Sequence, residues 1–296
     1  MSSFYRITPG RAIFNIINTI IMIGVIGITL FPILHVFAAS ISETIYIQQG
    51  KVGIFPRGFS LQAYKNVMKY PMIGMAYLNT ILYTSVGTVL SVVLTACAAY
   101  PLSRPRWYGQ KFFLFLIIFP MLFNGGIVPT FLVVRTVGLY NSRWAIILPT
   151  AIYSFYTLIM RTFFQQIPYE IEESAIIDGA SRIQCLFKMI FPLSKAGLVT
   201  IGLFYAVGLW NSYFPALIYL KDRAKYPIQL ILREIVVLSN ITEELSATRD
   251  MLAADAVAGE ALKYAAIFVT ILPIMAVYLW VQKYFVKGVL LGSIKG

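Results

Sequence analysis

Residues 172–192 read EESAIIDGASRIQCLFKMIFP. Four charged side chains fall within the first eleven residues of this segment: Glu172, Glu173, Asp178 and Arg182. Long apolar runs lie on both sides of it in the sequence. A charged segment between apolar runs of this length indicates a polar loop between membrane-spanning helices.

The composition of the whole chain supports a membrane protein. Of its 296 residues 59% are hydrophobic and only 12% are charged, whereas soluble domains carry about 25% charged residues. The bilayer is therefore the expected solvent. A net charge of +12 would suggest nucleic acid in a soluble protein. In a membrane protein it indicates Lys and Arg at the lipid interface, so no nucleic-acid partner is predicted.

The apolar runs predict six membrane-spanning helices, because a span needs about 20 mainly apolar residues. These are residues 13–38, 74–100, 112–134, 144–164, 197–219 and 264–286. Long polar loops are expected at 40–72 and 221–263, and a medium loop at 165–195 contains the opening segment. The first run is longer than the 7–15 apolar residues of a signal peptide, so it is read as a retained anchor. No internal repeat is visible, and residues 1–296 are read as one transmembrane domain.

Charge bias gives a weak indication of orientation. With the amino terminus inside, Lys and Arg divide evenly between the two sides of the membrane. Arg6 and Arg11 precede the first span, and the short loop 101–111 adds three more basic residues. Short loops and the first helix count most, so both termini and the 165–195 loop are predicted to be cytoplasmic.

The 165–195 loop predicts a small helix-turn-helix. Pro168 suits the first turn of a helix, and the three glutamates that follow it suit the positive end of the helix dipole. Gly179 can take the left-handed conformation that ends a helix. The next residues, RIQCLFKMI, predict a second amphipathic helix stopped by Pro192. Small residues in the first helix, Ser174 and Ala175, allow close approach of a partner.

This loop resembles the EAA loop of ABC importer permeases, whose usual form is E-A-A-x3-G-x9-I-x-L-P. Here Glu173-Ser174-Ala175 is followed by Gly179 and by Met189-Ile190-Phe191-Pro192. The departures retain size or apolarity. The resemblance implies a coupling helix that docks in a groove of an ATP-hydrolysing subunit. The residues that would carry this role are Glu172, Glu173, Ser174, Ala175, Asp178, Gly179, Ala180 and Pro192. The alternative is an interfacial hairpin without a partner.

The resemblance covers nearly the whole chain. Residues 79–104, 125–134, 209–217 and 284–296 are similar to carbohydrate-uptake permeases of the maltose type, closest to the G-like second permease. This implies the type I ABC importer permease fold: an all-α membrane protein of six spans. It also implies a second permease subunit, two ATPase subunits and an extracytoplasmic solute-binding protein.

Two further segments have expected contacts. The resemblance implies that Lys295 and Gly296 lie between the two ATPase subunits, the alternative being a frayed end. It also implies that the 221–263 loop meets the binding protein, the alternative being a solvated cap over the bundle.

The sequence offers no chemistry of its own. It contains no G-x-x-x-x-G-K-[ST] phosphate-binding loop, so ATP and Mg²⁺ are expected on partner subunits and no cofactor on this chain. His35 is the only histidine and makes neither a catalytic triad nor a metal cluster. The chain is therefore predicted not to be an enzyme, with no catalytic and no metal-binding residues.

A substrate path is suggested by polar and aromatic residues inside spans, which tend to face an interior route. The candidates are Trp210, Asn211, Tyr213, Phe214 and Asn79. Contacts between helices, with the amides hydrogen-bonded across the bundle, explain them as well.

The sequence thus predicts a permease subunit of a binding-protein-dependent ABC importer in the bacterial cytoplasmic membrane. Its substrate is an oligosaccharide or a polysaccharide fragment. The positive charge points to uronate-containing sugars, or instead to contacts with lipid or with the binding protein. The alternative function is a non-transport membrane protein, an enzyme or a signalling protein, that docks a cytosolic partner through the 165–195 loop.

Overall fold

The computed structural model describes residues 9–105, 107–123, 125–237 and 253–293. Within these ranges the chain is almost wholly helical, and the only β-pairing is an isolated bridge between Ser42 and Phe59. The longer helices are α1 (Pro9–Ser40), α4 (Ile73–Ser103), α5 (Gln110–Leu122), α6 (Ile127–Thr136), α8 (Ser154–Gln165), α9 (Tyr169–Ile177), α12 (Lys195–Trp210) and α15 (Ala253–Ser293). The shorter ones are α2 (Thr44–Gln48), α3 (Gln62–Lys69), α7 (Trp144–Ile147), η1 (Leu148–Thr150), α10 (Arg182–Gln184), η2 (Cys185–Ile190), α11 (Phe191–Leu193), α13 (Phe214–Tyr219) and η3 (Arg223–Lys225). The predicted all-α fold class is confirmed.

Membrane-spanning length is reached in two ways. Three helical stretches in the described residues are long and apolar enough to cross a bilayer by themselves: α1, α4 and Glu260–Leu279 within α15. Three bent pairs of helices bring the number to as many as six, if each pair counts as one span. The six predicted spans overlap these straight helices and bent pairs.

Three of the predicted spans are interrupted, which is a correction to their boundaries. Span 112–134 is divided between α5 and α6, and span 144–164 bends by 56° between Trp144–Thr150 and Ser154–Gln165. Span 197–219 leaves the helical path after Trp210 and resumes in α13. Pro149 lies in η1 before the bend, and Pro215 is the second residue of α13. A proline has no N–H to give to the preceding turn, which favours these breaks.

The chain forms two compact units, the first being Met1–Tyr70 with Glu234–Val269. In this unit most apolar side chains of α1 are exposed until its end, where Ala38 and Ala39 are fully buried. The chain after α1 is fixed to the helix by Ser42, whose hydroxyl donates to the carbonyl of Ala38 at 2.6 Å. His35 Nδ1 is hydrogen-bonded to the carbonyl of Gly53 at 3.0 Å, so the single histidine has a structural partner.

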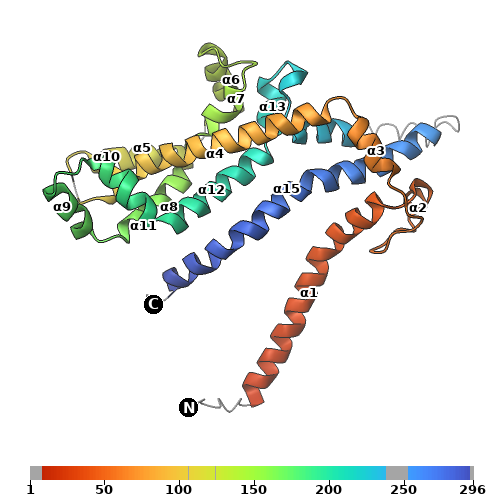
Figure 1. The fold of residues 1–296 in the computed structure, drawn as a ribbon, viewed down its shortest axis with the longest axis horizontal. Helices are drawn as coiled ribbons and strands as arrows, with labels where there is room; N and C mark the ends of the chain where they lie inside the picture. The colour runs from red at the N-terminus through yellow and green to blue at the C-terminus, as the bar shows by residue number, and fades with distance from the viewer. Residues whose placement is uncertain (1–8, 106, 124, 238–252, 294–296) are drawn as a thin grey trace. The chain divides into compact units, whose positions relative to one another are not determined.

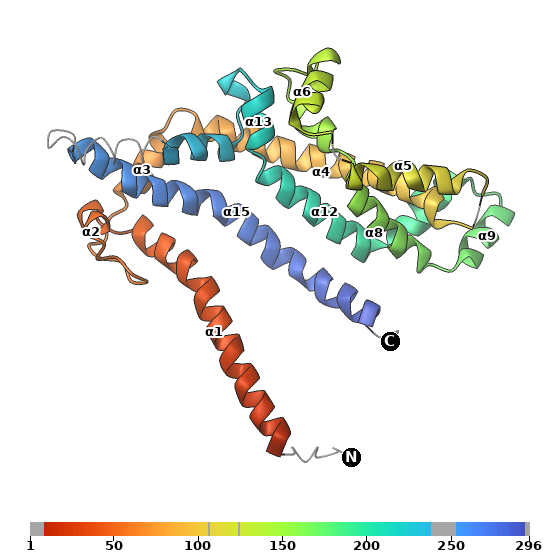
Figure 2. The same ribbon diagram turned by 180° about the vertical axis from the view of Figure 1, so that it is seen from behind.

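The second unit is Pro71–Arg233 with Thr270–Gly296. In both views of the ribbon α4, α8 and α12 run alongside one another (Figures 1 and 2). Small residues on α4, Ala96 and Ala99, are fully buried between the larger Met160 and Phe164 of α8 and Ile201 of α12. Small residues at such contacts let membrane helices approach closely.

The 165–195 loop is built onto this same core. Leu186 and Ile190 of η2 are buried in the cluster that α4, α8 and α12 form. The predicted second helix is present as α10, η2 and α11. It continues through Pro192 to Leu193, so the prediction that Pro192 stops it is wrong by one residue. The chain then turns by 87° at Ser194 into α12.

We predict that Gly197→Ala destabilises the second unit. An added β-carbon would lie 2.6 Å from Cγ of Phe163 and 3.0 Å from its Cβ, atoms too close to the backbone to move aside easily. Overfilling of this kind costs about 1–3 kcal/mol, so the thermal unfolding midpoint in detergent should fall. The matched control is Gly208→Ala on the same helix, where the β-carbon meets nothing within 4 Å. Equal midpoints for the two variants would contradict the close contact.

Candidate functional site

Helix α9 is positioned by its two ends. Pro168 lies just before the helix in an extended conformation (ψ 134°), one position earlier than the predicted first turn. Glu170 and Glu172 occupy the first turn, where the helix dipole favours negative charge. At the other end Gly179 has φ +89°, so the predicted left-handed turn is confirmed. The N–H of Ala180 closes the turn on the carbonyl of Ala175 at 2.9 Å.

The second helical stretch begins with a reciprocal cap. The N–H of Gln184 donates to the hydroxyl of Ser181 at 3.3 Å, and the N–H of Ser181 donates to Oε1 of Gln184 at 2.8 Å. Such a capping box satisfies N–H groups that have no partner within the helix. The stretch then widens into the π-helix η2, which places Leu186 and Ile190 in the core. The turn at Gly179 is thus held between two locally determined helix ends.

A buried ion pair fixes α9 to the rest of the unit. Glu172 has a side chain only 1% exposed, and its Oε2 lies 2.7 Å from Nε of Arg104, which directly follows α4 and is 7% exposed. The hydroxyl of Tyr100 donates to Oε1 of the same carboxylate. Tyr100 also lies beside Arg104, with the guanidinium carbon 5.1 Å from the ring centroid. Arg182 approaches Oε1 from the solvent side at 3.7 Å.

The remaining candidate coupling residues lie outward. Glu173, Ser174, Asp178, Gly179 and Pro192 are exposed, and Ala175 and Ala180 are half-buried. Glu172 therefore faces inward, while its neighbour Glu173 faces out.

Sequence reasoning did not assign the residues that complete this site. Arg104 entered only as a charge that marks orientation, and Tyr100 was not singled out. Ile177 and Ile183, on either side of the turn, are 81% and 71% exposed. Ile177 adjoins Asp178 and Ile183 adjoins Arg182 in the sequence, so each is an exposed apolar side chain next to a charged one.

The candidate path residues have different surroundings. Trp210 is 8% exposed, and its Nε1–H donates to the carbonyl of Thr270 at 3.2 Å. Oδ1 of Asn211 accepts from Nε2 of Gln229 at 3.3 Å. Tyr213 and Phe214 are 42% and 43% exposed. A role of these residues in a substrate path stays a prediction.

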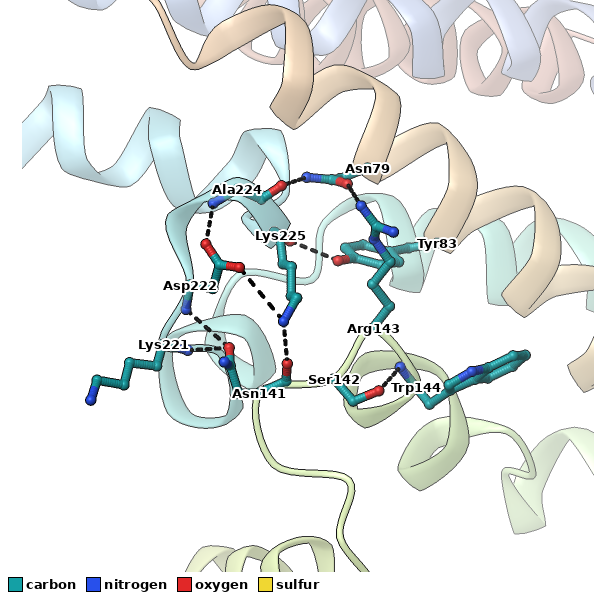
Figure 3. A network of polar contacts seen from close by, with 10 residues as sticks. All are labelled: Asn79, Tyr83, Asn141, Ser142, Arg143, Trp144, Lys221, Asp222, Ala224 and Lys225. Atoms are coloured by element: carbon teal, nitrogen blue, oxygen red, sulfur yellow. Dashed lines mark hydrogen bonds and ion pairs between the residues drawn. The ribbon is translucent and has the colours of Figure 1, made fainter.

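Asn79 belongs to a polar network at the other end of α4 from α9. Its side chain is buried, and Nδ2 donates to the carbonyl of Ala224 at 2.8 Å (Figure 3). The same Nδ2 donates to the carbonyl of Tyr226 at 3.2 Å. Arg143 Nη2 donates to its Oδ1 at 3.4 Å, and Tyr83 donates to the carbonyl of Lys225 at 2.7 Å. These contacts agree with the alternative interpretation of Asn79, in which its side chain is hydrogen-bonded within the bundle.

Asn141 joins two loops in the same network. It has φ +58°, a left-handed conformation that asparagine tolerates. Its Oδ1 accepts the N–H groups of Lys221 and Asp222, both at 3.0 Å, and its carbonyl accepts from Nζ of Lys225 at 2.7 Å (Figure 3). We call this network of residues 79, 83, 141–144 and 221–226 the outer clasp.

Two of the predicted contact segments lie wholly or partly outside the residues that the structure describes. Lys295 and Gly296 lie outside the described residues, as does the central part of the 221–263 loop, residues 238–252. In the described part of the chain no three His, Cys, Asp or Glu side chains come together in a way that could hold a metal ion.

Residues 87–291 match the family model described as "Binding-protein-dependent transport system inner membrane component". The chain is 43% identical over 290 residues to Protein LplC of Bacillus subtilis (strain 168), covering 98% of this chain and 97% of that one. It is also 43% identical over 270 residues to the polygalacturonan/rhamnogalacturonan transport system permease protein YtcP of the same organism, covering 91% and 93%.

A solved structure is similar over the same extent. It is a chain of a bacterial ABC transporter involved in the import of the acidic polysaccharide alginate. The TM-score is 0.85 at 36% sequence identity, and the match covers 96% of this chain and 100% of the other.

We predict that Glu172→Gln loosens α9. The change removes the charge that balances the buried guanidinium of Arg104, and breaking a buried ion pair costs about 3–5 kcal/mol. The thermal unfolding midpoint in detergent should fall, and protease should cut residues 165–195 more readily. Glu173→Gln is the matched control, because that carboxylate is exposed. If both variants melted at the same temperature, the ion pair would not be holding the helix.

For the outer clasp we predict that Asn141→Ala lowers stability by about 1–2 kcal/mol. It removes the acceptor of two N–H groups and places a less tolerant residue at positive φ. Asn141→Asp keeps both properties and should stay close to the parent protein. Hydrogen exchange of the Lys221 and Asp222 amides is the measurement, and it should quicken only in the alanine variant. Unchanged exchange in that variant would show that the loop does not depend on Asn141.

Proposed function

The chain belongs to the family of binding-protein-dependent transport system inner membrane components, and on that premise we propose that it is a permease subunit of an ABC importer that carries oligosaccharides or polysaccharide fragments into the cytoplasm. One observation carries the mechanism: a charged helix, α9, presents its outer face while a buried ion pair fixes its inner face to the end of α4. Such a helix can pass a movement from a partner to the span behind it.

The coupling role is assigned to the outer residues of the 165–195 loop. Glu173, Ser174 and Asp178 would meet an ATPase subunit, with the exposed Ile177 and Ile183 filling an apolar groove. Gly179 sets the angle between the two helices. ATP and Mg²⁺ would be bound by the ATPase subunits, since this sequence has no phosphate-binding loop, so the chain would carry no cofactor and no enzymatic activity of its own.

The complex would contain this chain, a second permease, two ATPase subunits and an extracytoplasmic binding protein. Closure of the ATPase pair would move α9 and, through Glu172 and Arg104, the end of α4. The spans would then alternate between inward- and outward-facing states around a central site. In this arrangement both termini would be cytoplasmic in a bacterial cell.

The substrate class is an acidic oligosaccharide. Support comes from the printed names of similar proteins: a permease for polygalacturonan and rhamnogalacturonan, and an importer of the acidic polysaccharide alginate. The net charge of +12 favours approach of an anionic substrate to the membrane surface.

The test is uptake of labelled tetragalacturonate by cells that contain the whole transporter. Gly179→Val should reduce uptake more than tenfold without loss of the protein from the membrane, because a β-branched residue at φ +89° forces the turn into another conformation at a cost of about 1–2 kcal/mol. Gly179→Asn tolerates positive φ and should retain most of the uptake. The parent protein should co-purify with an ATPase and a second permease.

Two results would contradict this function. Equal uptake by the valine variant and the parent would remove the coupling role of the turn. Recovery of the chain alone from mild detergent, with no saccharide uptake dependent on it, would favour the non-transport alternative.

A further inference from the structure

A pocket of about 240 Å³ lies where the fourth span is broken. Residues 151–153 leave the helical path between η1 and α8, and the opposite wall is the carboxyl-terminal half of α12. Non-helical backbone at membrane depth is tolerated where it is buried in protein or lines a cavity. Broken helices are also where transporters commonly build substrate sites.

Four aromatic rings shape this pocket. The ring of Tyr156 is stacked with Phe204, with centroids 5.6 Å apart and planes 27° apart. Tyr205 meets Tyr156 edge-on at 4.9 Å, and Tyr153 lies 5.4 Å from Tyr156. Tyr153 and Phe204 are 48% and 37% exposed. Part of the aromatic surface is therefore open to an occupant.

The position of Tyr205 is fixed by hydrogen bonds, which also hold the backbone of Tyr153. Tyr205 is 2% exposed, and its hydroxyl accepts the N–H of Tyr153 at 2.9 Å. The same hydroxyl is hydrogen-bonded to Thr95 of α4 at 2.7 Å. These contacts tie the unwound residue 153 to α12 and α4, so the pocket is formed before any ligand arrives. A preformed site avoids the cost of ordering its side chains on binding.

The chemistry of the lining suits a sugar ring. Hydroxyls of Thr150 and Ser212 join the tyrosines, and none of the described residues that line the pocket is charged. A pyranose offers a flat face of C–H groups and a rim of hydroxyls, which match aromatic faces and hydroxyls respectively. A cavity of about 150 Å³ can hold a benzene ring, so a pocket of about 240 Å³ has room for a single sugar ring.

We propose that this pocket holds one pyranose ring of the transported saccharide by its C–H face, independently of the charge on that ring. The inference rests on the proposed function, and it adds a contact on this chain for the sugar itself. Selection for acidic saccharides then takes place elsewhere in the transporter, because the pocket has no cation to pair with a carboxylate.

The test uses a cysteine on the pocket wall in the assembled complex. Gly208 lines the pocket, is exposed, and would place a β-carbon with nothing within 4 Å. Gly208→Cys is made with Cys97→Ser, because Cys97 is exposed, while the native Cys185 is buried. The rate of its modification by a small thiol reagent is measured with and without millimolar tetragalacturonate. Ala206→Cys is the matched control, since it lines a separate pocket on the opposite side of α12.

Protection is expected at position 208 and not at 206. The fully methyl-esterified tetragalacturonate, which has the same rings without charge, should protect as well as the acid. Tyr156→Leu should raise the concentration for half-protection about tenfold, because a stacked ring contributes about one order of magnitude in affinity. Tyr156→Phe retains the ring and should behave like the parent. Phe155→Leu, an exposed aromatic position that does not line the pocket, should also leave protection unchanged.

Several outcomes would overturn the inference. Protection by neither saccharide, or by the acid alone, would rule out a charge-independent ring site. A cysteine at 208 that reacts in the isolated chain and never in the complex would show that a partner subunit fills the pocket. Uptake of tetragalacturonate by the parent complex is measured in parallel. Uptake without protection refutes the pocket and leaves the proposed function standing, whereas absence of any saccharide uptake refutes the function itself.

Discussion

The ion pair between Glu172 and Arg104 fixes the position of the 165–195 loop on the helix bundle. A carboxylate that is 1% exposed is costly to bury, and here its charge is balanced by a guanidinium at 2.7 Å and by the hydroxyl of Tyr100. Because these partners belong to the end of α4, the helix that carries Glu172 cannot move independently of α4. The loop therefore belongs mechanically to the bundle, although its composition is that of a surface segment.

Helix α4 contacts the structures at both ends of the second unit. Helix α4 meets the loop through Tyr100 and the outer clasp through Asn79 and Tyr83. Along its length it lies against α8 and α12, which also form the walls of the aromatic pocket. Packed side chains thus run without interruption from the 165–195 loop to the pocket. Tyr205 lies on this path, bonded to α4 through Thr95 and to residue 153 through its backbone.

Local signals in the sequence were enough to predict the local features. The helix start after Pro168, the left-handed Gly179 and the six apolar runs depend on neighbours within a few residues. The sequence could not show which distant residues of the chain these side chains contact. Tyr100 and Glu172 are 72 residues apart, and Asn79 is 145 residues from Ala224, so nothing nearby in the chain marks either pair. For the same reason Asn79 was placed with the candidate path residues, and the pocket of Tyr153, Tyr156, Phe204 and Tyr205 was not foreseen.

The hydrogen bonds of the outer clasp make its loop a rigid surface. The loop 221–226 is held through its main chain on both sides. Asn141 Oδ1 accepts the N–H groups of Lys221 and Asp222, and Asn79 Nδ2 donates to the carbonyls of Ala224 and Tyr226. The backbone of a loop held in this way has little freedom to change conformation when a partner binds. A partner that met this loop would therefore dock against a preformed surface. The exposed Lys221 and Arg223 would speed the approach of a negatively charged partner, and added salt would weaken this attraction.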